Sequence, residues 1–172
     1  NKTALWLHTL ERMLGWDTLQ RILSTYFTRY AFRHPAPENF FAGTTEGSGT
    51  VRVIPSGRHS VRDRTRGRRD ASGALHLDQI VMEEGKPDRR RTWRLERAGG
   101  NRVTGTISDA RGRVSGEIDG NTLHLSYRLE EGPSVEQWIT LHRGGRSASN
   151  RMVFRRYGVR VATVETVLRR VD

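Results

Sequence analysis

Arg151 is the side chain whose position most clearly allows binding chemistry. It follows Asn150 and precedes the apolar run 152–154, so a strand through this segment would place the guanidinium among apolar neighbours. A buried arginine needs a carboxylate partner or a bound anion. Two interpretations remain open: a structural ion pair with Glu165 across a hairpin, or a contact with the carboxylate or phosphate group of a ligand.

Large aromatic side chains lie on separate segments in which apolar and polar residues alternate. Trp93 and Leu95 share one face of their segment, because Thr92 and Arg94 take the other. By the same alternation Tyr127 points to the same interior. Such aromatics either pack as a core or line a cavity for one small apolar ligand. The second hypothesis predicts a ligand-binding set in which Asn150 or Arg151 meets the polar end of the ligand: Trp93, Tyr127, Trp138, Phe154, Asn150 and Arg151.

The sequence shows no complete pattern for catalysis or metal binding. None of its six histidines forms the i, i+4 pair of a helical zinc site, and the chain has no cysteine. His124 and His142 could meet across strands, but a solvent-facing histidine is the commoner outcome. No Gly-x-Ser-x-Gly turn is present, and the pairs Glu83-Glu84 and Glu130-Glu131 stand beside turns, where solvated carboxylates are expected. We therefore predict a protein that is not an enzyme and has no metal site and no cofactor.

The charge is strongly basic, and almost all of it is arginine. The net charge is +11, and all but two of the 30 basic residues are arginines, with the highest density in 58–69 and 89–91. Such runs can attract nucleic acid or anionic lipid surfaces. The run 58–69 contains no aromatic residue for base stacking, so a solvated outer strand face is favoured. Any nucleic-acid binding should be weak, independent of sequence and sensitive to salt.

Two kinds of hydrophobic periodicity divide the chain. Apolar residues at helical spacing predict helices over 3–14 and 19–30, and Pro35 and Pro37 end this part. From Thr44 onward apolar residues alternate with polar ones, and Gly-rich turns recur every 8–12 residues or so, which is typical of an antiparallel barrel or sandwich. Hairpin-length connections favour an up-and-down barrel, since closure removes exposed edges. We predict a short helical hairpin over residues 1–36 and a mainly β domain of about ten strands over 37–172.

Motifs along the β segment resemble those of the bacterial family known as domain of unknown function 3833. They are Phe41-x-Gly43, Gly47-x-Gly49, the Trp93 strand, Gly105…Asp109…Gly112…Gly116, Gly120-Asn121-x-Leu123, Gln137-Trp138, Asn150-Arg151, Tyr157-Gly158 and Glu165. The resemblance covers residues 37–172 and implies a lipocalin-like barrel, often on a lipoprotein, with no established activity. Where members carry Asp-Asp-Trp this chain has Glu136-Gln137-Trp138, so a paired-carboxylate role there does not carry over. Without cysteine, no lipid anchor is expected.

The N-terminal segment resembles a different family. Residues 2–15, 19–23 and 26–35 are similar to the helical stretch that follows the zinc site in aminopeptidase N-type peptidases, but the His-Glu-x-x-His motif is missing. This resemblance implies a scaffold without catalytic residues.

The function predicted first is a lipocalin-like binding module for a hydrophobic or amphipathic small molecule, such as a lipid. The alternatives are a basic protein that binds nucleic acid or an anionic surface, and an inactive aminopeptidase fragment fused to a barrel. No run of about 18 apolar residues is present, so no membrane span is predicted. We expect a soluble bacterial protein of the cytoplasm or periplasm, and the sequence leaves the compartment, the oligomeric state and the ligand open.

Overall fold

The computed structural model describes residue 9 and residues 12–13, 15–26 and 36–172. The helix predicted over 3–14 lies almost wholly outside the described residues. The helix predicted over 19–30 is present in its described part as α2 (Trp16–Tyr26), where Leu19 is buried and Ile22 is half exposed. No helix among the described residues is long and apolar enough to cross a membrane.

The C-terminal part consists of one short helix, α3 (Pro37–Phe40), and ten strands. The strands are β1 (Thr44–Val53), β2 (Gly57–Arg69), β3 (Leu75–Glu83), β4 (Arg89–Arg97), β5 (Arg102–Ile107), β6 (Ala110–Asp119), β7 (Thr122–Leu129), β8 (Ser134–Leu141), β9 (Ser147–Arg156) and β10 (Val159–Arg170).

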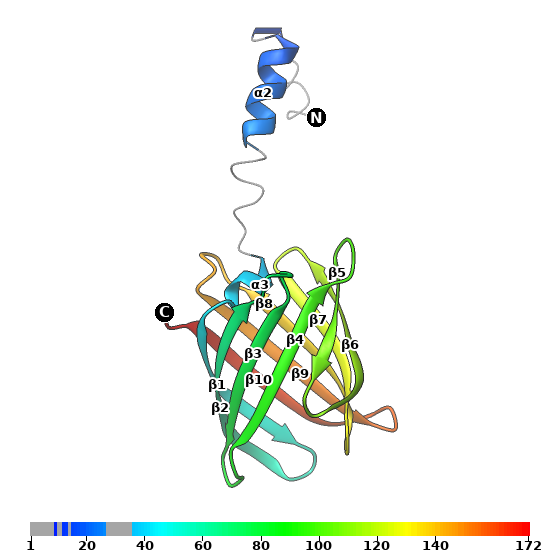
Figure 1. The fold of residues 1–172 in the computed structure, drawn as a ribbon. Coiled ribbons are helices and arrows are strands. Elements are labelled where there is room, and N and C mark those ends of the chain that lie inside the picture. The colour runs from blue at the N-terminus through cyan, green and yellow to red at the C-terminus, as the bar shows by residue number, and fades with distance from the viewer. Residues whose placement is uncertain (1–8, 10–11, 14, 27–35) are drawn as a thin grey trace. The chain divides into compact units, whose positions relative to one another are not determined.

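The strands form a closed antiparallel barrel in chain order, and β10 pairs with β1 to complete it (Figure 1). Every connection is a hairpin, so no strand crosses over another. The predicted mainly β fold, an up-and-down lipocalin-like barrel of about ten strands, is confirmed.

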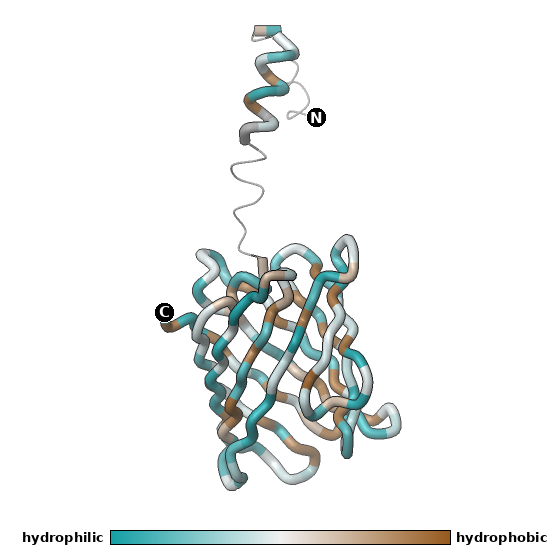
Figure 2. Tube along the Cα trace, in the orientation of Figure 1, coloured by the Kyte–Doolittle hydropathy of each residue, from teal (hydrophilic) through white to brown (hydrophobic). Residues whose placement is uncertain are grey.

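Alternation sorts the side chains of each strand into an inner and an outer set. On β2 the inner set is Val61, Asp63 and Thr65, while the arginines at 62, 64, 66 and 68 are exposed on the outside. Hydrophilic and hydrophobic residues therefore alternate along many of the strands in Figure 2. The arginines of this run lie on the outer face of β2, as we predicted from the sequence.

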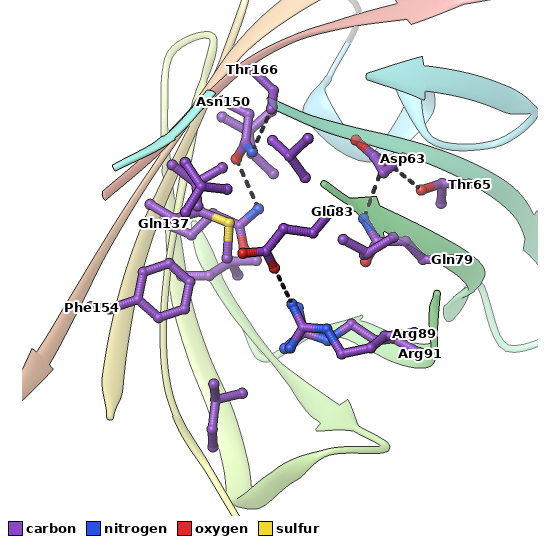
Figure 3. A pocket seen from close by; sticks show the side chains of 18 of the residues that line it. Asp63, Thr65, Gln79, Glu83, Arg89, Arg91, Gln137, Asn150, Phe154 and Thr166 are labelled. Carbon is purple, nitrogen blue, oxygen red and sulfur yellow. Dashed lines mark hydrogen bonds and ion pairs between the residues drawn. The ribbon is translucent and has the colours of Figure 1, made fainter. Parts of the chain in front are cut away.

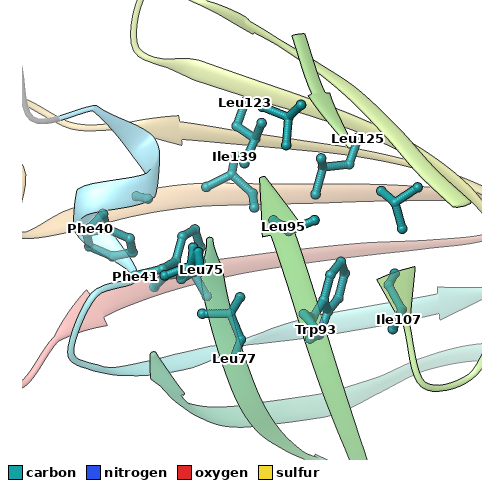
Figure 4. Close-up of a cluster of buried hydrophobic side chains, with 14 of the residues drawn as sticks. Phe40, Phe41, Leu75, Leu77, Trp93, Leu95, Ile107, Leu123, Leu125 and Ile139 are labelled. Atoms are coloured by element: carbon teal, nitrogen blue, oxygen red, sulfur yellow. The ribbon is translucent and has the colours of Figure 1, made fainter. Parts of the chain in front are cut away.

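One end of the barrel, here named the closed end, carries α3. Pro37 occupies the first turn of this helix, where its missing N–H costs nothing. Phe40 is 1% exposed and packs edge-to-face on Phe41, with 5.1 Å between ring centroids. Both rings join the main apolar cluster (Figure 4).

The opposite end, here named the mouth, is formed by the turns that follow β1, β3, β5, β7 and β9. The chain enters β1 at the closed end, and antiparallel order then places every second turn at the mouth (Figure 1).

Candidate ligand-binding cavity

A cavity of about 410 Å³ lies inside the barrel. Its apolar lining extends from Phe41 and Leu168 near the closed end to Phe154 and Val164 nearer the mouth. The lining also includes Lys86 and Arg89, whose side chains are 54% exposed, so the cavity meets solvent at the mouth. This volume is in the range of pockets that hold one small organic molecule.

The mouth holds a buried acid, Glu83, surrounded by basic groups. Its carboxylate accepts from Lys86 Nζ at 2.7 Å, lies 3.4 Å from Arg89 Nη2 and contacts His59 Nε2. Burial acts to raise the pKa of Glu83, but hydrogen bonds and charges from its basic neighbours outweigh burial and lower it. The mouth therefore carries an ionised carboxylate with its countercharges in place.

Halfway along the barrel, four strands contribute one chain of interior hydrogen bonds. Asn150 Nδ2 donates to Thr166 Oγ1 at 3.0 Å, and Gln137 Nε2 donates to Asn150 Oδ1 at 2.8 Å. The hydroxyl of Tyr127 donates to Gln137 Oε1 at 3.2 Å. This chain, here named the amide belt, runs from β10 through β9 and β8 to β7.

A second interior chain crosses β4, β3 and β2. Trp93 Nε1 donates to Gln79 Oε1 at 3.1 Å, and Gln79 Nε2 donates to Asp63 Oδ2 at 3.2 Å. The same carboxylate oxygen accepts from Thr65 Oγ1 at 3.2 Å. We name this chain the acid belt. Figure 3 shows Gln137, Asn150 and Thr166 of the amide belt on one side of the cavity and Asp63, Thr65 and Gln79 of the acid belt on the facing side.

Asp63 differs from the other interior acids in its electrostatic environment. Asp63 is only 9% exposed, and burial raises the pKa of its carboxyl group. The hydrogen bonds from Gln79 and Thr65 lower this pKa, but they do not cancel the effect of burial. Both of these donors are neutral. The cavity wall thus contains an acid whose charged form is disfavoured by its surroundings.

The two belts meet where the ring of Trp93 contacts the ring of Tyr127, beside Arg91. Arg91 is 7% exposed, donates from Nε to Asp109 Oδ2 at 2.8 Å and lies 5.9 Å above the ring of Trp93. The Trp93 and Tyr127 rings meet edge-to-face with 5.7 Å between centroids. Burial raises the pKa of the Tyr127 hydroxyl to about 12, with Arg91 opposing the shift.

Tyr127 should remain protonated in the folded barrel at pH values where ordinary tyrosines ionise. The native hydroxyl holds a proton that the unfolded chain releases above pH 10 or so, so native stability should fall as the pH rises from about 10 to about 12. Two pKa units correspond to about 3 kcal/mol. Denaturant melts across this window measure the loss, which Tyr127→Phe should reduce. Simultaneous ionisation of all tyrosines near pH 10 in the folded protein would contradict the assignment.

Three of the six predicted site residues lie on the cavity wall: Trp93, Asn150 and Phe154. Tyr127 is buried beside Trp93 and does not line the cavity itself. Their role as ligand contacts stays a prediction.

Trp138 and Arg151 were predicted inside and lie outside. Successive strand residues face opposite ways, so the inward amides of Gln137 and Asn150 turn the next residue outward. Trp138 stacks on His124, with ring centroids 4.8 Å apart. Arg151 is 56% exposed and forms the cross-strand ion pair with Glu165 at 3.8 Å, one of its two interpretations from sequence. These two residues cannot contact a molecule in the cavity.

The sequence reasoning missed most of the polar interior. It treated 58–69 as a basic run and Glu83 as a solvated turn residue, yet Asp63 and Glu83 both line the cavity. The alternation along this segment could have shown it: Asp63 and Thr65 lie on the same strand face as Val61, and the arginines lie on the other face. The described residues contain no group of three or more side chains arranged to hold a metal ion.

Among solved structures, the chain is similar to an S-type phycobiliprotein lyase from Guillardia theta. The TM-score is 0.62 at 9% sequence identity, and the match covers 78% of this chain and 90% of that chain. At such low identity the likeness shows the shared barrel fold. A search of curated proteins gave no match.

The prediction that the chain is not an enzyme was wrong. A protein with the same barrel fold is named a lyase, so the fold gives no ground for excluding catalysis. Nor do these matches support the resemblance of residues 1–42 to zinc aminopeptidases.

The motif resemblance along the β segment is confirmed by a match to a family model. The model, described as protein of unknown function (DUF3833), matches residues 22–170. The match starts within α2, earlier than the predicted boundary at residue 37, and includes all ten strands. The chain therefore belongs to the DUF3833 family.

Proposed function

We propose that the barrel binds an amphipathic small molecule in its central cavity. The observation that carries this proposal is the cavity itself, about 410 Å³ in volume, with apolar walls, two polar belts and an outlet at Lys86 and Arg89. A barrel whose interior is filled with side chains would leave no such space.

The apolar walls would supply affinity and the belts would supply orientation. Burial of a ligand chain contributes about 0.8 kcal/mol per methylene, so roughly eight buried carbons outweigh much of the cost of immobilising the molecule. Asn150 and Asp63 lie on facing walls, where each could bind a polar group of the ligand. In this arrangement Asn150 keeps the role predicted for it, while Arg151 has none.

The neutral fluorophore N-phenyl-1-naphthylamine should bind to the protein saturably, with one site per chain. Ala162 lines the cavity next to Phe154 on the paired strand, so Ala162→Trp should occupy part of the space and weaken binding about tenfold or more. Fluorescence titration measures both affinities. Arg151→Gln, on the outer surface, is the matched control and should leave the affinity unchanged.

The absence of saturable fluorescence in the wild-type protein would contradict the proposed function. Equal binding by the wild type and Ala162→Trp, with circular dichroism showing both folded, would locate the probe outside the cavity.

The outer arginines support a second candidate less well. Arg62, Arg64, Arg66 and Arg68 form an exposed row that could contact phosphates, and Arg64 is 3.7 Å from Glu46. The outer face of β2 has no aromatic residue on which a base could stack. The cavity is the more specific feature, and it favours the small-molecule function.

A further inference from the structure

We propose that Asp63 binds a protonated amine of the ligand, so that the cavity selects amphipathic organic cations. This inference rests on the proposed function and adds the chemical class of the molecule that the cavity takes.

The first observation is that Asp63 is buried without a countercharge. No ion pair joins its carboxylate to a basic side chain in the part of the chain that the structure describes, and its two hydrogen bonds come from a hydroxyl and an amide. An isolated carboxylate in an apolar interior is costly unless a cation or a set of donors compensates it. A ligand ammonium group would complete this site.

The second observation is the contrast with two acids on or beside the same cavity. Glu83 has Lys86 and Arg89, and Asp109 has Arg91. The barrel thus supplies a protein cation for each of these acids and none for Asp63, among the described residues. The missing partner is a property of this one position on the wall.

The third observation is that one oxygen of the Asp63 carboxylate accepts no hydrogen bond from the described residues. Both hydrogen bonds reach Oδ2, which leaves Oδ1 as the oxygen available to a ligand. Oδ1 lies over Gly47 of β1, where a Cβ atom would come within 2.1 Å of it. The glycine therefore leaves room for the carboxylate on the cavity wall.

The charge of Asp63 is not needed for its hydrogen bonds in the fold. An asparagine could keep a carbonyl oxygen at the position of Oδ2 and accept from Thr65 and Gln79 as before. Because burial raises the pKa of Asp63, the ionised form lowers native stability as the pH rises, and Asp63→Asn should be at least as stable at neutral pH. A charge that the hydrogen bonding does not require is consistent with a role in binding.

The test is displacement of N-phenyl-1-naphthylamine from the whole chain by three competitors of one chain length: decylamine, decanol and decanoate. Decylamine should displace the probe from the wild-type protein at about one tenth of the concentration that decanol needs, the gain typical of a charge-assisted hydrogen bond. Asp63→Asn should lose this preference and bind decanol unchanged. Asp78→Asn changes an exposed carboxylate on the adjacent strand and should behave as the wild type.

The outcomes separate this inference from the proposed function. Probe binding without amine preference in the wild type would overturn the role of Asp63 and leave the cavity function standing. A preference for decanoate would do the same and would indicate that the mouth cations receive the head group. Equal amine preference in the wild type and Asp63→Asn would also overturn it. If Asp63→Asn fails to fold, the ranking of the three competitors in the wild type still decides.

Discussion

Replacing Phe40 with alanine should lower the free energy of unfolding by about 3 to 5 kcal/mol, the largest loss expected of any substitution considered for this barrel. Phe40 is 1% exposed and is the largest fully buried side chain among the described residues. It packs on Phe41, whose side chain forms the base of the cavity. Truncation would remove the apolar area that Phe40 buries and leave a void where α3 covers the barrel.

Urea denaturation of the wild type and Phe40→Ala measures this loss. Val159→Ala is the matched control, because Val159 is a large apolar residue that is 66% exposed, and it should change stability by less than about 0.5 kcal/mol. Equal stabilities for wild type and Phe40→Ala would mean that α3 does not contribute to barrel folding.

Gly67→Ala should destabilise the barrel by about 2 to 4 kcal/mol, through overpacking and the loss of a hydrogen bond. The segment that joins α3 to β1 passes directly over Gly67, whose N–H donates to the carbonyl of Gly43 at 2.8 Å. A Cβ atom at Gly67 would come within 1.6 Å of the Phe41 carbonyl oxygen, which belongs to the backbone and cannot rotate away.

The control for this substitution is Gly132→Ala. Gly132 lies in the mouth turn after β7, and the atom closest to its added Cβ would be 3.4 Å away, an ordinary contact. Its denaturation midpoint should stay close to that of the wild type. A Gly67→Ala protein as stable as Gly132→Ala would show that the closed end yields to the methyl group at little cost.

These two substitutions test how the closed end is held in place, and the cavity depends on that end. Phe41 lines the cavity and connects to β1 through the segment that covers Gly67. A barrel without this covering would be open at both ends, and an apolar ligand would then contact water at its base. Stability and binding should therefore weaken together in Phe40→Ala.

The periodicity of the sequence determined the fold because it is a local property. Alternation at positions such as Trp93, Leu95, Leu123 and Leu125 requires a sheet with one apolar face, and turn residues such as Gly120-Asn121 require hairpins. A sheet connected only by hairpins closes with little choice of strand order. Local signals were therefore sufficient for the strands and their hairpin order, while the long-range pairing of β10 with β1 closes the barrel.

The composition of the site depends on how strands pair, and the sequence alone did not predict it. The apolar neighbours of Arg151 suggested that its side chain is buried. Because Asn150 faces the barrel interior, Arg151 faces outward, and only strand pairing decides which of the two faces inward. Trp138 was assigned to the interior as a large aromatic, although Gln137 occupies that direction. By residue type alone, Arg151 and Trp138 could each have faced the interior or the outside of the barrel.

By itself the sequence determined the period, the turns and hence the strands and their order, since these depend on residues close together in the chain. Tertiary structure alone decided that Asp63 on β2, Gln79 on β3 and Trp93 on β4 would share one chain of hydrogen bonds, because the register between strands sets those contacts. It also decided that Asp63 has no basic partner among the described residues while Glu83 has three, His59, Lys86 and Arg89. The electrostatic environment of a carboxylate depends on side chains far away in sequence, which is why the strand pattern predicted the wall of this cavity but not its chemistry.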